Sequence, residues 1–219
     1  IRHFPEYVSE EMFLSEIRRI NQDPKVHGIL VQLPLPGQIS EAKVLQAVDP
    51  AKDVDGFHPL NQGKNFSGAE SFRPATPLGI MRLLEETRVK LPGKNAVVIG
   101  RSNIVGKPVA LMLINAGCTV TVCNSKTRKL EYYTKNADII VSAAGKPRLV
   151  RAGMVKQGAI VIDVGITKGA DGKLVGDVDF GPVRKRASWI TPVPGGVGPM
   201  TIASVIVNTL KACRGQGRG

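Results

Sequence analysis

The loop that precedes Pro108 has residue types suited to binding a phosphate group. The run Ala96–Ile99 before it is apolar, as a buried strand requires, and Pro108 presets the first turn of a helix after it. Gly100 permits a tight turn, and Gly106 permits close packing of helix on strand. Ser102 replaces the middle glycine of the usual G-x-G-x-x-G pattern. The spacing fits a purely structural glycine turn as well, but its place between strand and helix predicts a dinucleotide site, with phosphates held by free N–H groups of the first helical turn.

The residues after the apolar run Thr119–Val122 indicate which dinucleotide is bound. A site for NAD places Asp or Glu here, to accept a hydrogen bond from the ribose 2′-hydroxyl. This sequence has no acid at that point, and small donors and cations follow instead. Ser125 with Arg101 or Lys126 could hydrogen-bond a 2′-phosphate, which a carboxylate would repel. We therefore expect NADP, the alternative being that these are solvated residues at the start of a helix.

These loops need a sheet to position them, and the second half of the chain predicts one. Four short runs there are dominated by Val, Ile and Ala: 96–99, 119–122, 138–142 and 159–164. Because the runs are apolar on both faces and alternate with helices, they predict a doubly wound parallel sheet of the Rossmann type, within an α/β protein. Right-handed crossovers place the loops at the carboxyl ends of the strands on one edge, where ligands bind.

The remaining elements are predicted from periodicity and capping residues. Helices are expected at 8–20 with Ser9 near the start, at 40–48 with Ser40 as N-cap, from Thr76-Pro77 to 87, at 108–116 and at 200–210. The run 28–33 predicts a buried strand, and 49–79 predicts mostly loop because it is rich in Gly, Pro, Asn and Asp.

Composition and charge exclude several classes of protein. The 219 residues include 30 Lys and Arg against 18 Asp and Glu, a formal net charge of +12, and 42% are hydrophobic, as in a globular chain. No apolar run approaches the roughly 20 residues of a membrane span. Residues 101–219 alone hold +12, which indicates either a solvated, solubilising surface or an anionic partner such as a phosphorylated cofactor or an acidic substrate. Nucleic acid is not favoured, since aromatic residues make up only 5%. The three cysteines form no C-x-x-C pair, which indicates a reducing, cytoplasmic location, and no metal site is expected.

Several longer motifs identify a family. They are Gln32-Leu33-Pro34-Leu35-Pro36, Lys52-Asp53-Val54-Asp55-Gly56, Pro74-Ala75-Thr76-Pro77, Asp163-Val164-Gly165-Ile166, Gly176-Asp177-Val178 and Pro194-Gly195-Gly196-Val197-Gly198-Pro199-Met200-Thr201. With the glycine turn, they resemble the bifunctional methylenetetrahydrofolate dehydrogenase/methenyltetrahydrofolate cyclohydrolase family over nearly the whole chain.

The resemblance implies NADP-dependent oxidation of 5,10-methylenetetrahydrofolate, then hydrolysis of the methenyl product to 10-formyltetrahydrofolate. It implies a place in one-carbon metabolism and, through it, in purine, methionine and histidine biosynthesis. It implies a folate/catalytic domain at 1–76, an NADP domain at 77–197 and, at 198–219, a helix that returns to the folate domain and ends in a frayed tail, with the active site in the cleft. Polyglutamylated tetrahydrofolates are the implied substrates, and the implied assembly is a homodimer through the dinucleotide domains.

Site residues follow from the resemblance by motif position. Gln32 matches the family residue that tunes a catalytic lysine, and as an amide after an apolar run it should be buried and need partners. Asp55 matches the carboxylate that accepts two N–H groups of the pterin, although Asp53 could do the same and spacing does not separate them. The implied cofactor contacts are Gly100, Arg101, Ser102, Gly106, Ser125 and the backbone of Ile166. The side-chain-poor loop Pro194-Gly195-Gly196 suits close approach to a flat ligand, or is merely a strained connection.

One part of the family pattern is absent. The family carries a Tyr-x-x-x-Lys pair on an N-terminal helix, and residues 11, 136 and 137, which lie four after the tyrosines of this chain, are Glu, Asn and Ala. We therefore expect a family member that lacks its first strand–helix segment. The alternative function is a catalytically impaired module that binds NADP or folate. In either case His27 and His58 are expected to be structural, because neither has a spaced carboxylate or a Ser or Cys partner.

Overall fold

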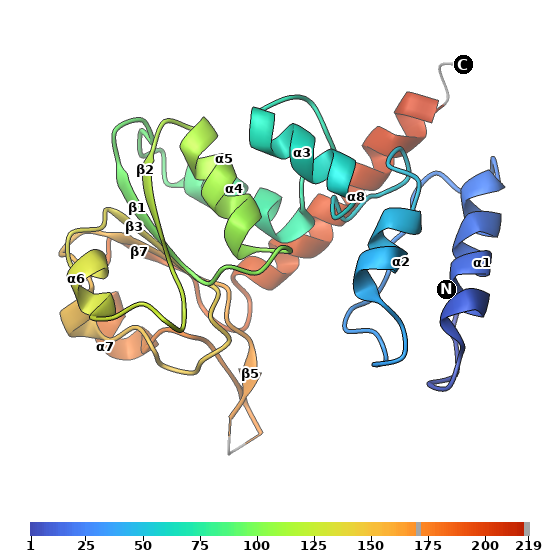
Figure 1. The fold of residues 1–219 in the computed structure, drawn as a ribbon. Helices are drawn as coiled ribbons and strands as arrows, with labels where there is room; N and C mark the ends of the chain where they lie inside the picture. Colours follow the sequence, from blue (N-terminus) through green and yellow to red (C-terminus); the bar gives the residue numbers. More distant parts are fainter. Residues whose placement is uncertain (170–171, 217–219) are drawn as a thin grey trace. The chain divides into compact units, whose positions relative to one another are not determined.

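The computed structural model describes residues 1–169 and 172–216, which form two compact units (Figure 1). Unit 1 comprises residues 1–75 together with the chain from Val205 onward, and unit 2 comprises residues 76–204. The tail predicted to fray begins at Arg214: residues 214–216 are helical, contrary to that prediction, and residues 217–219 lie outside the described residues.

Unit 2 contains a five-stranded parallel sheet in the order β2-β1-β3-β4-β7. Its strands are β1 (Asn95–Ile99), β2 (Thr119–Cys123), β3 (Ile139–Ser142), β4 (Ile160–Asp163) and β7 (Trp189–Ile190). The first four lie where the Val-, Ile- and Ala-rich runs predicted them, and the doubly wound α/β class is confirmed. Two elements too short for periodicity to reveal, β5 (Thr167–Lys168) and β6 (Leu174–Val175), form a separate antiparallel pair.

Burial on both faces explains why these strands read as continuous apolar runs. Along β1, Val98 belongs to a cluster with residues of α4 (Ala75–Glu86) and α5 (Gly106–Asn115), whereas Val97 belongs to a second cluster on the opposite face. The second face packs against η1 (Ala152–Met154) and α7 (Phe180–Arg184), with α6 (Leu130–Thr134) also in this unit. A strand with both faces covered has no polar side, so alternation is lost.

Unit 1 is mainly helical among the described residues. The helices α1 (Glu10–Gln22) and α2 (Glu41–Ala47) begin as predicted, because the side chains of Ser9 and Ser40 accept hydrogen bonds from amides of their first turns. Glu10 joins the two helices, since its carboxylate accepts from the Ser40 amide at 2.7 Å and pairs with Lys43. Apolar residues of both helices form a shared core.

One prediction in unit 1 is wrong and another is incomplete. The run 28–33 is not a strand: it forms a single parallel bridge, Ile29 to Asp53, and Leu30 is exposed, because one bridge partner cannot build a ladder. The segment 49–79 is mostly non-helical, as predicted, but it also contains α3 (Pro59–Ser67), which the prediction missed. His58 caps α3 by accepting from the Leu60 amide at 3.0 Å, so a cap residue followed by proline was the signal.

The last helix, α8 (Val197–Gln216), extends at both ends beyond the predicted 200–210. It begins in unit 2, and its residues from Val205 onward belong to unit 1. There the Asn208 amide donates to the carbonyls of Val54 (2.8 Å) and Arg73 (3.0 Å). The side chain of Gln216 donates to two further backbone carbonyls of unit 1, which holds the final turn in a helical conformation.

Candidate active site

The carboxyl ends of four strands of unit 2 lie in one row. The register pairs Cys123 with Ile99, Ile99 with Ser142, and Ser142 with Asp163. The four loops that follow these residues therefore start from the same edge of the sheet. Because β1 pairs with β2 on one side and β3 on the other, the chain order reverses there, and this is where doubly wound sheets bind ligands.

The loop after β1 lies with its backbone against the loop after β3. Gly100 has a φ of +125°, and a Cβ atom there would lie 2.2 Å from the carbonyl oxygen of Ala143. A Cβ atom at Gly106 would lie 2.3 Å from the carbonyl oxygen of Gly100. No side chain fits at either position, so the turn and the start of α5 are held by backbone packing.

The amides of this loop correct one detail of the expected phosphate site. Ser102 Oγ accepts from the amides of Val105 and Gly106, both at 3.2 Å, and the Ser102 carbonyl accepts from the Lys107 amide. The first turn of α5 therefore has fewer free N–H groups than expected. Within the described residues, no hydrogen bond uses the backbone N–H groups of residues 101–104, so the donors available to an anion lie in the loop just before α5 rather than in its first turn.

The end of β2 supplies hydroxyl and cationic groups beside this loop. The Gly100 amide donates to the Cys123 carbonyl at 2.9 Å, which joins the ends of the two strands. Asn124 forms a tight turn, its Oδ1 accepting from the Lys126 amide at 2.9 Å. Ser125 and Lys126 are exposed, as is Arg101 on the neighbouring loop. The turn thus presents these side chains to solvent with no acid in 124–130.

The structure reveals two site residues that sequence reasoning missed, Asp163 and Asp177. Both are buried, and between them they accept hydrogen bonds from backbone groups of three segments, 144–146, 165 and 177–178. Burial, and secondarily the charge of Asp177, raises the pKa of Asp163 to about 6, against the lowering effect of its hydrogen bonds. For Asp163 the signal was an acid at the end of an apolar strand run, whereas Asp177 has no such signal in its local sequence.

The other expected contacts of unit 2 also lie in loops that leave this edge. Ile166, which directly follows Gly165, is 60% exposed, so its side chain is open to solvent. Pro194 and Gly195 are exposed and Gly196 is buried. Gly195 has a φ of +97°, and a Cβ atom there would have no neighbour within 4 Å, so this part of the loop leaves its backbone open.

In unit 1 the structure distinguishes Asp53 from Asp55. The Asp53 carboxylate is buried and accepts hydrogen bonds from the amides of Phe57 (3.1 Å) and His58 (2.8 Å) and from Asn61 Nδ2 (2.9 Å). The Asp55 carboxylate accepts none within the described residues. Burial, with a smaller contribution from the charge of Asp53, raises the pKa of Asp55 to about 6.

Gln32 is exposed, which contradicts the expectation of a buried amide. The segment 28–33 pairs with the rest of unit 1 at a single β-bridge, where the Ile29 amide donates to the Lys52 carbonyl at 2.7 Å. The Gln32 Nε2 group donates to the Leu33 carbonyl at 2.9 Å, and its Oε1 atom remains free to accept. Because the bridge is parallel, Gln32 and Asp55 both lie beyond it in the same chain direction.

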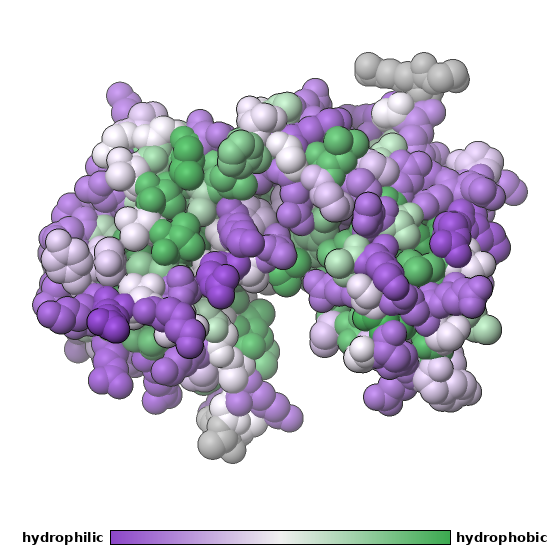
Figure 2. Space-filling model, viewed as in Figure 1, coloured by the Kyte–Doolittle hydropathy of each residue, from purple (hydrophilic) through white to green (hydrophobic). Residues whose placement is uncertain are grey.

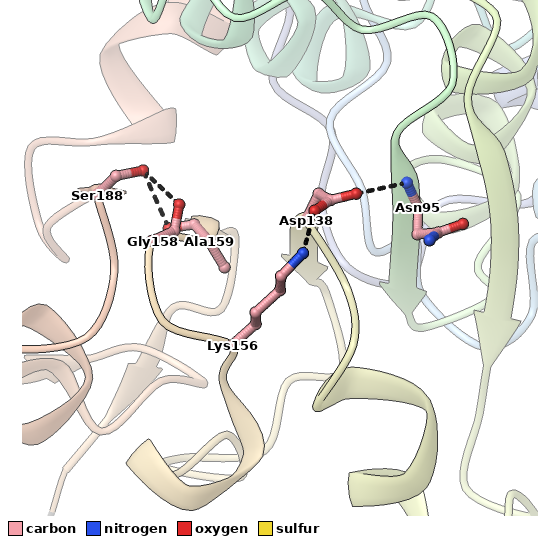
Figure 3. Close-up of polar contacts among 6 residues, drawn as sticks. All are labelled: Asn95, Asp138, Lys156, Gly158, Ala159 and Ser188. Carbon is pink, nitrogen blue, oxygen red and sulfur yellow. Dashed lines mark hydrogen bonds and ion pairs between the residues drawn. The ribbon is translucent and has the colours of Figure 1, made fainter.

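Two of the cavities lie away from these residues. On unit 1, a cavity of about 590 Å³ is lined by apolar side chains and by the Lys211–Glu70 ion pair. At the amino-terminal edge of the sheet, a cavity of about 190 Å³ contains Lys156 and Asp138, which pair at 2.6 Å, and Asp138 also accepts from the Asn95 amide (Figure 3). The hydrogen bond from Lys156 lowers the pKa of Asp138.

Two searches bear on metals and membranes. Among residues 1–169 and 172–216, no three His, Cys, Asp or Glu side chains gather as a metal site would require. Within the same part of the chain, none of the helices has the length and apolar character needed to span a bilayer.

Comparison with known proteins gives matches along most of the chain. A family model described as the NAD(P)-binding domain of tetrahydrofolate dehydrogenase/cyclohydrolase matches residues 74–217, and the model of the catalytic domain matches residues 1–55. The bifunctional protein FolD of Nautilia profundicola is 54% identical over 214 residues, which cover 98% of this chain and 75% of that protein. That of Cupriavidus necator is 57% identical over 209 residues, which cover 95% and 74%.

Solved structures of proteins from the same family superpose on this chain. The bifunctional FolD enzyme of Campylobacter jejuni superposes with a TM-score of 0.96 at 53% identity, over 98% of this chain and 76% of that one. The methylenetetrahydrofolate dehydrogenase-cyclohydrolase of Trypanosoma brucei, complexed with NADP and an inhibitor, superposes with a TM-score of 0.93 at 42% identity, over 99% and 76%. The chain spans about three quarters of the length of these relatives.

Proposed function

The chain belongs to the tetrahydrofolate dehydrogenase/cyclohydrolase family, and from this premise we propose which of its residues serve the two reactions. The enzyme oxidises 5,10-methylenetetrahydrofolate to 5,10-methenyltetrahydrofolate with NADP and hydrolyses the product to 10-formyltetrahydrofolate. A module that only binds its ligands is not favoured, since the matched relatives are named as bifunctional proteins.

The residues at the carboxyl edge of unit 2 fit NADP. Gly100 and Gly106 leave the backbone of this turn without side chains, so a ligand can approach it closely, and the unused N–H groups of residues 101–104 can bind a pyrophosphate. Arg101 and Ser102 stand on this loop, where a guanidinium adds charge. Ser102 contributes by shaping the loop, because its hydroxyl is already bonded to two amides. The bound dinucleotide supplies the hydride acceptor of the oxidation.

Ser125 and Arg101 are proposed to hold the 2′-phosphate of NADP. The support is that both are exposed on adjacent strand ends in a segment without acids. Ser125→Asp should place a carboxylate against the phosphate and shift the ratio of NADP to NAD affinity toward NAD by at least about tenfold. Calorimetric titration with both dinucleotides measures the ratio, Ser125→Ala controls for loss of the hydroxyl, and an unchanged ratio in Ser125→Asp would contradict the assignment.

On the folate side, Asp55 is proposed to bind the pterin. An ionised carboxylate accepts two adjacent N–H groups at once, and Asp55 has both oxygens unused whereas Asp53 has none. Gln32 is proposed as the residue that orients a proton-carrying group, because its Nε2 is tied to Leu33 and its Oε1 can accept. Each side chain thus offers the acceptor that its role requires.

The nicotinamide end of the cofactor is proposed to meet the loops after β4 and β7. Ile166 offers an exposed apolar side chain and the backbone groups next to it. Pro194, Gly195 and Gly196 form a surface poor in side chains, which allows a flat ring to approach backbone closely. These contacts would orient the ring without contributing charge.

We also propose the finer properties that the family resemblance implies. A homodimer through unit 2 is supported by hydrophobic residues that gather on the surface where α5 and β2 lie (Figure 2). Ile114 of α5 and Val122 of β2 are 51% and 41% exposed. Polyglutamylated folates are proposed as substrates because the chain carries +12. A cytoplasmic location, with roles in purine, methionine and histidine biosynthesis, is supported by three unpaired cysteines and the folate reactions.

The observation that carries the proposal is the backbone-lined turn at the switch between β1 and β3, with cations and no acid beside it. The test is a pair of assays on the purified protein. NADPH formation should depend on 5,10-methylenetetrahydrofolate, and methenyltetrahydrofolate should be consumed without any cofactor. A protein that binds both ligands and turns over neither would support the binding-only alternative.

A further inference from the structure

Asp177 binds the loop after β3 through four hydrogen bonds. It is fully buried, and its carboxylate accepts from Ser142 Oγ (3.2 Å) and from the amides of Ala144 (2.6 Å), Gly145 (3.2 Å) and Lys146 (2.8 Å). Three successive amides thus converge on one side chain. This loop is the one whose Ala143 carbonyl touches Gly100, so Asp177 determines the shape of one wall of the dinucleotide turn.

Asp163 in turn determines where Asp177 lies. It is the last residue of β4, and its carboxylate accepts from the amides of Gly165 (3.0 Å), Asp177 (2.9 Å) and Val178 (2.9 Å). Its own amide donates to Thr191 Oγ1 at 2.8 Å, next to the loop that leads to Gly195. One carboxylate therefore bends the chain before Ile166 and also fixes the segment that carries Asp177.

These contacts connect the loops that follow β3, β4 and β7. We propose that Asp163 and Asp177 act as positioning residues for the dinucleotide, by holding the loops after β3 and β4 in the geometry that receives it. The inference rests on the proposed function, and it adds two residues that do not themselves touch the ligand. Their effect reaches the bound molecule through backbone that they order.

The chemistry of the side chain explains why an acid is needed. An ionised carboxylate is an acceptor on every face, which matches a set of converging N–H donors. Asparagine has the same shape but would direct its NH₂ group at one or more of those donors, leaving buried amides without a partner. The Asp→Asn change therefore removes some of the hydrogen bonds that hold these loops while keeping the volume of the side chain.

The test compares Asp177→Asn and Asp163→Asn with Asp179→Asn. Asp179 lies two residues from Asp177, and its side chain makes no capping hydrogen bond to α7, so it is a matched control. Affinity for NADP is measured by titration, and hydrogen exchange is followed at the amides of residues 144–146. We expect about tenfold weaker NADP binding and a raised KM for NADP in the two variants, faster exchange in Asp177→Asn, and wild-type behaviour in the control.

If these residues only stabilised the fold, their loss would change the KM for NADP and the KM for methylenetetrahydrofolate alike. The KM for methylenetetrahydrofolate is therefore measured in parallel and should stay unchanged. Ser142→Ala removes one of the four donors to Asp177 and decides the matter if Asp177→Asn does not fold: it should weaken NADP binding less, in the same direction. Wild-type NADP affinity in these variants would overturn the inference and leave the proposed function standing. A wild-type protein that binds no NADP would overturn the proposed function itself.

Discussion

Asp53 and Asp55 show how two neighbouring carboxylates acquire different chemistry from their surroundings. Asp53 is saturated by the amides of Phe57 and His58 and by Asn61, so it acts within the fold. Asp55 is part-buried and has no such partner, and a ligand with paired N–H groups would complete its hydrogen bonding. The difference comes from where the chain places donors, which residue type alone does not reveal.

Asp55→Asn is predicted to weaken folate binding about tenfold or more, because an amide offers one acceptor where the carboxylate offers two. NADP affinity should not change, since Asp55 belongs to unit 1 and the dinucleotide residues to unit 2. Titration with a tetrahydrofolate and with NADP measures both. Folate binding equal to that of the wild type would remove Asp55 from the site.

The raised pKa of Asp55 predicts a pH dependence of folate binding. Burial raises this pKa from 3.8 to about 6, so the carboxylate that accepts from the pterin becomes protonated as the pH falls below 6. Folate binding should weaken about tenfold between pH 7 and pH 5. Asp55→Asn cannot titrate and should lose this difference, and equal slopes in the two proteins would contradict the prediction.

The same shift predicts the opposite trend for stability. Because the folded state binds the proton of Asp55 more tightly than the unfolded chain does, its stabilising contribution is complete below pH 3.8 and is lost as the pH rises through about 6. The free energy of unfolding of wild type minus that of Asp55→Asn should therefore fall over this range. Denaturant titrations at a series of pH values measure the difference, and a rise would contradict the sign.

At the scale of the element, α3 depends on groups that precede it. His58 caps the Leu60 amide, and the Asp53 carboxylate binds the amides just before the helix together with Asn61 inside it. Polar residues thus support a helix whose composition resembles that of a loop.

Asp53→Asn is predicted to lower the free energy of unfolding by about 2–3 kcal/mol, because a buried charged acceptor is lost and its donors are left unpaired. Asp49→Asn is the control, since Asp49 accepts a single exposed hydrogen bond from the Ala51 amide at 2.8 Å. Thermal or denaturant unfolding measures the change. If both variants lose equally little, the network is not what stabilises α3.

At the scale of the whole molecule, β2 is an edge strand of the sheet in unit 2. Unpaired edges and exposed apolar side chains are ordinary sites of association. If the proposed homodimer forms through this surface, Ile114→Glu should convert it to a monomer, because burying an unpaired carboxylate in an apolar interface is costly. Sedimentation over a range of concentrations measures the state, and Met12→Glu in α1, where Met12 is 63% exposed, is the control. A variant that remains dimeric would place the interface elsewhere.

The sequence predicted the parts of this protein that local chemistry determines. Ser9 and Ser40 cap α1 and α2 as predicted, the apolar runs form β1 to β4, and the glycine spacing located the tight turn between β1 and α5. It failed in two places: 28–33 has strand composition but one bridge partner, and α3 has loop composition but is supported by polar groups of the turn just before it.

What the sequence determined by itself was the fold class, the family and the order of the loops, since these follow from residue type, periodicity and motif spacing. Only the tertiary structure decided which polar groups are already satisfied. In the folded protein the Asp53 carboxylate has hydrogen-bond partners, whereas that of Asp55 does not. Gln32 is exposed, and the Ser102 hydroxyl is bonded within its own loop. Asp163 and Asp177 are buried. Most partners of Asp163 and Asp177 lie far along the chain and leave no trace in local sequence, whereas the partners of Asp53 and Ser102 are close in sequence but reach the acceptor only once the turn has folded. Whether an acceptor already has a partner decides whether it can bind a ligand.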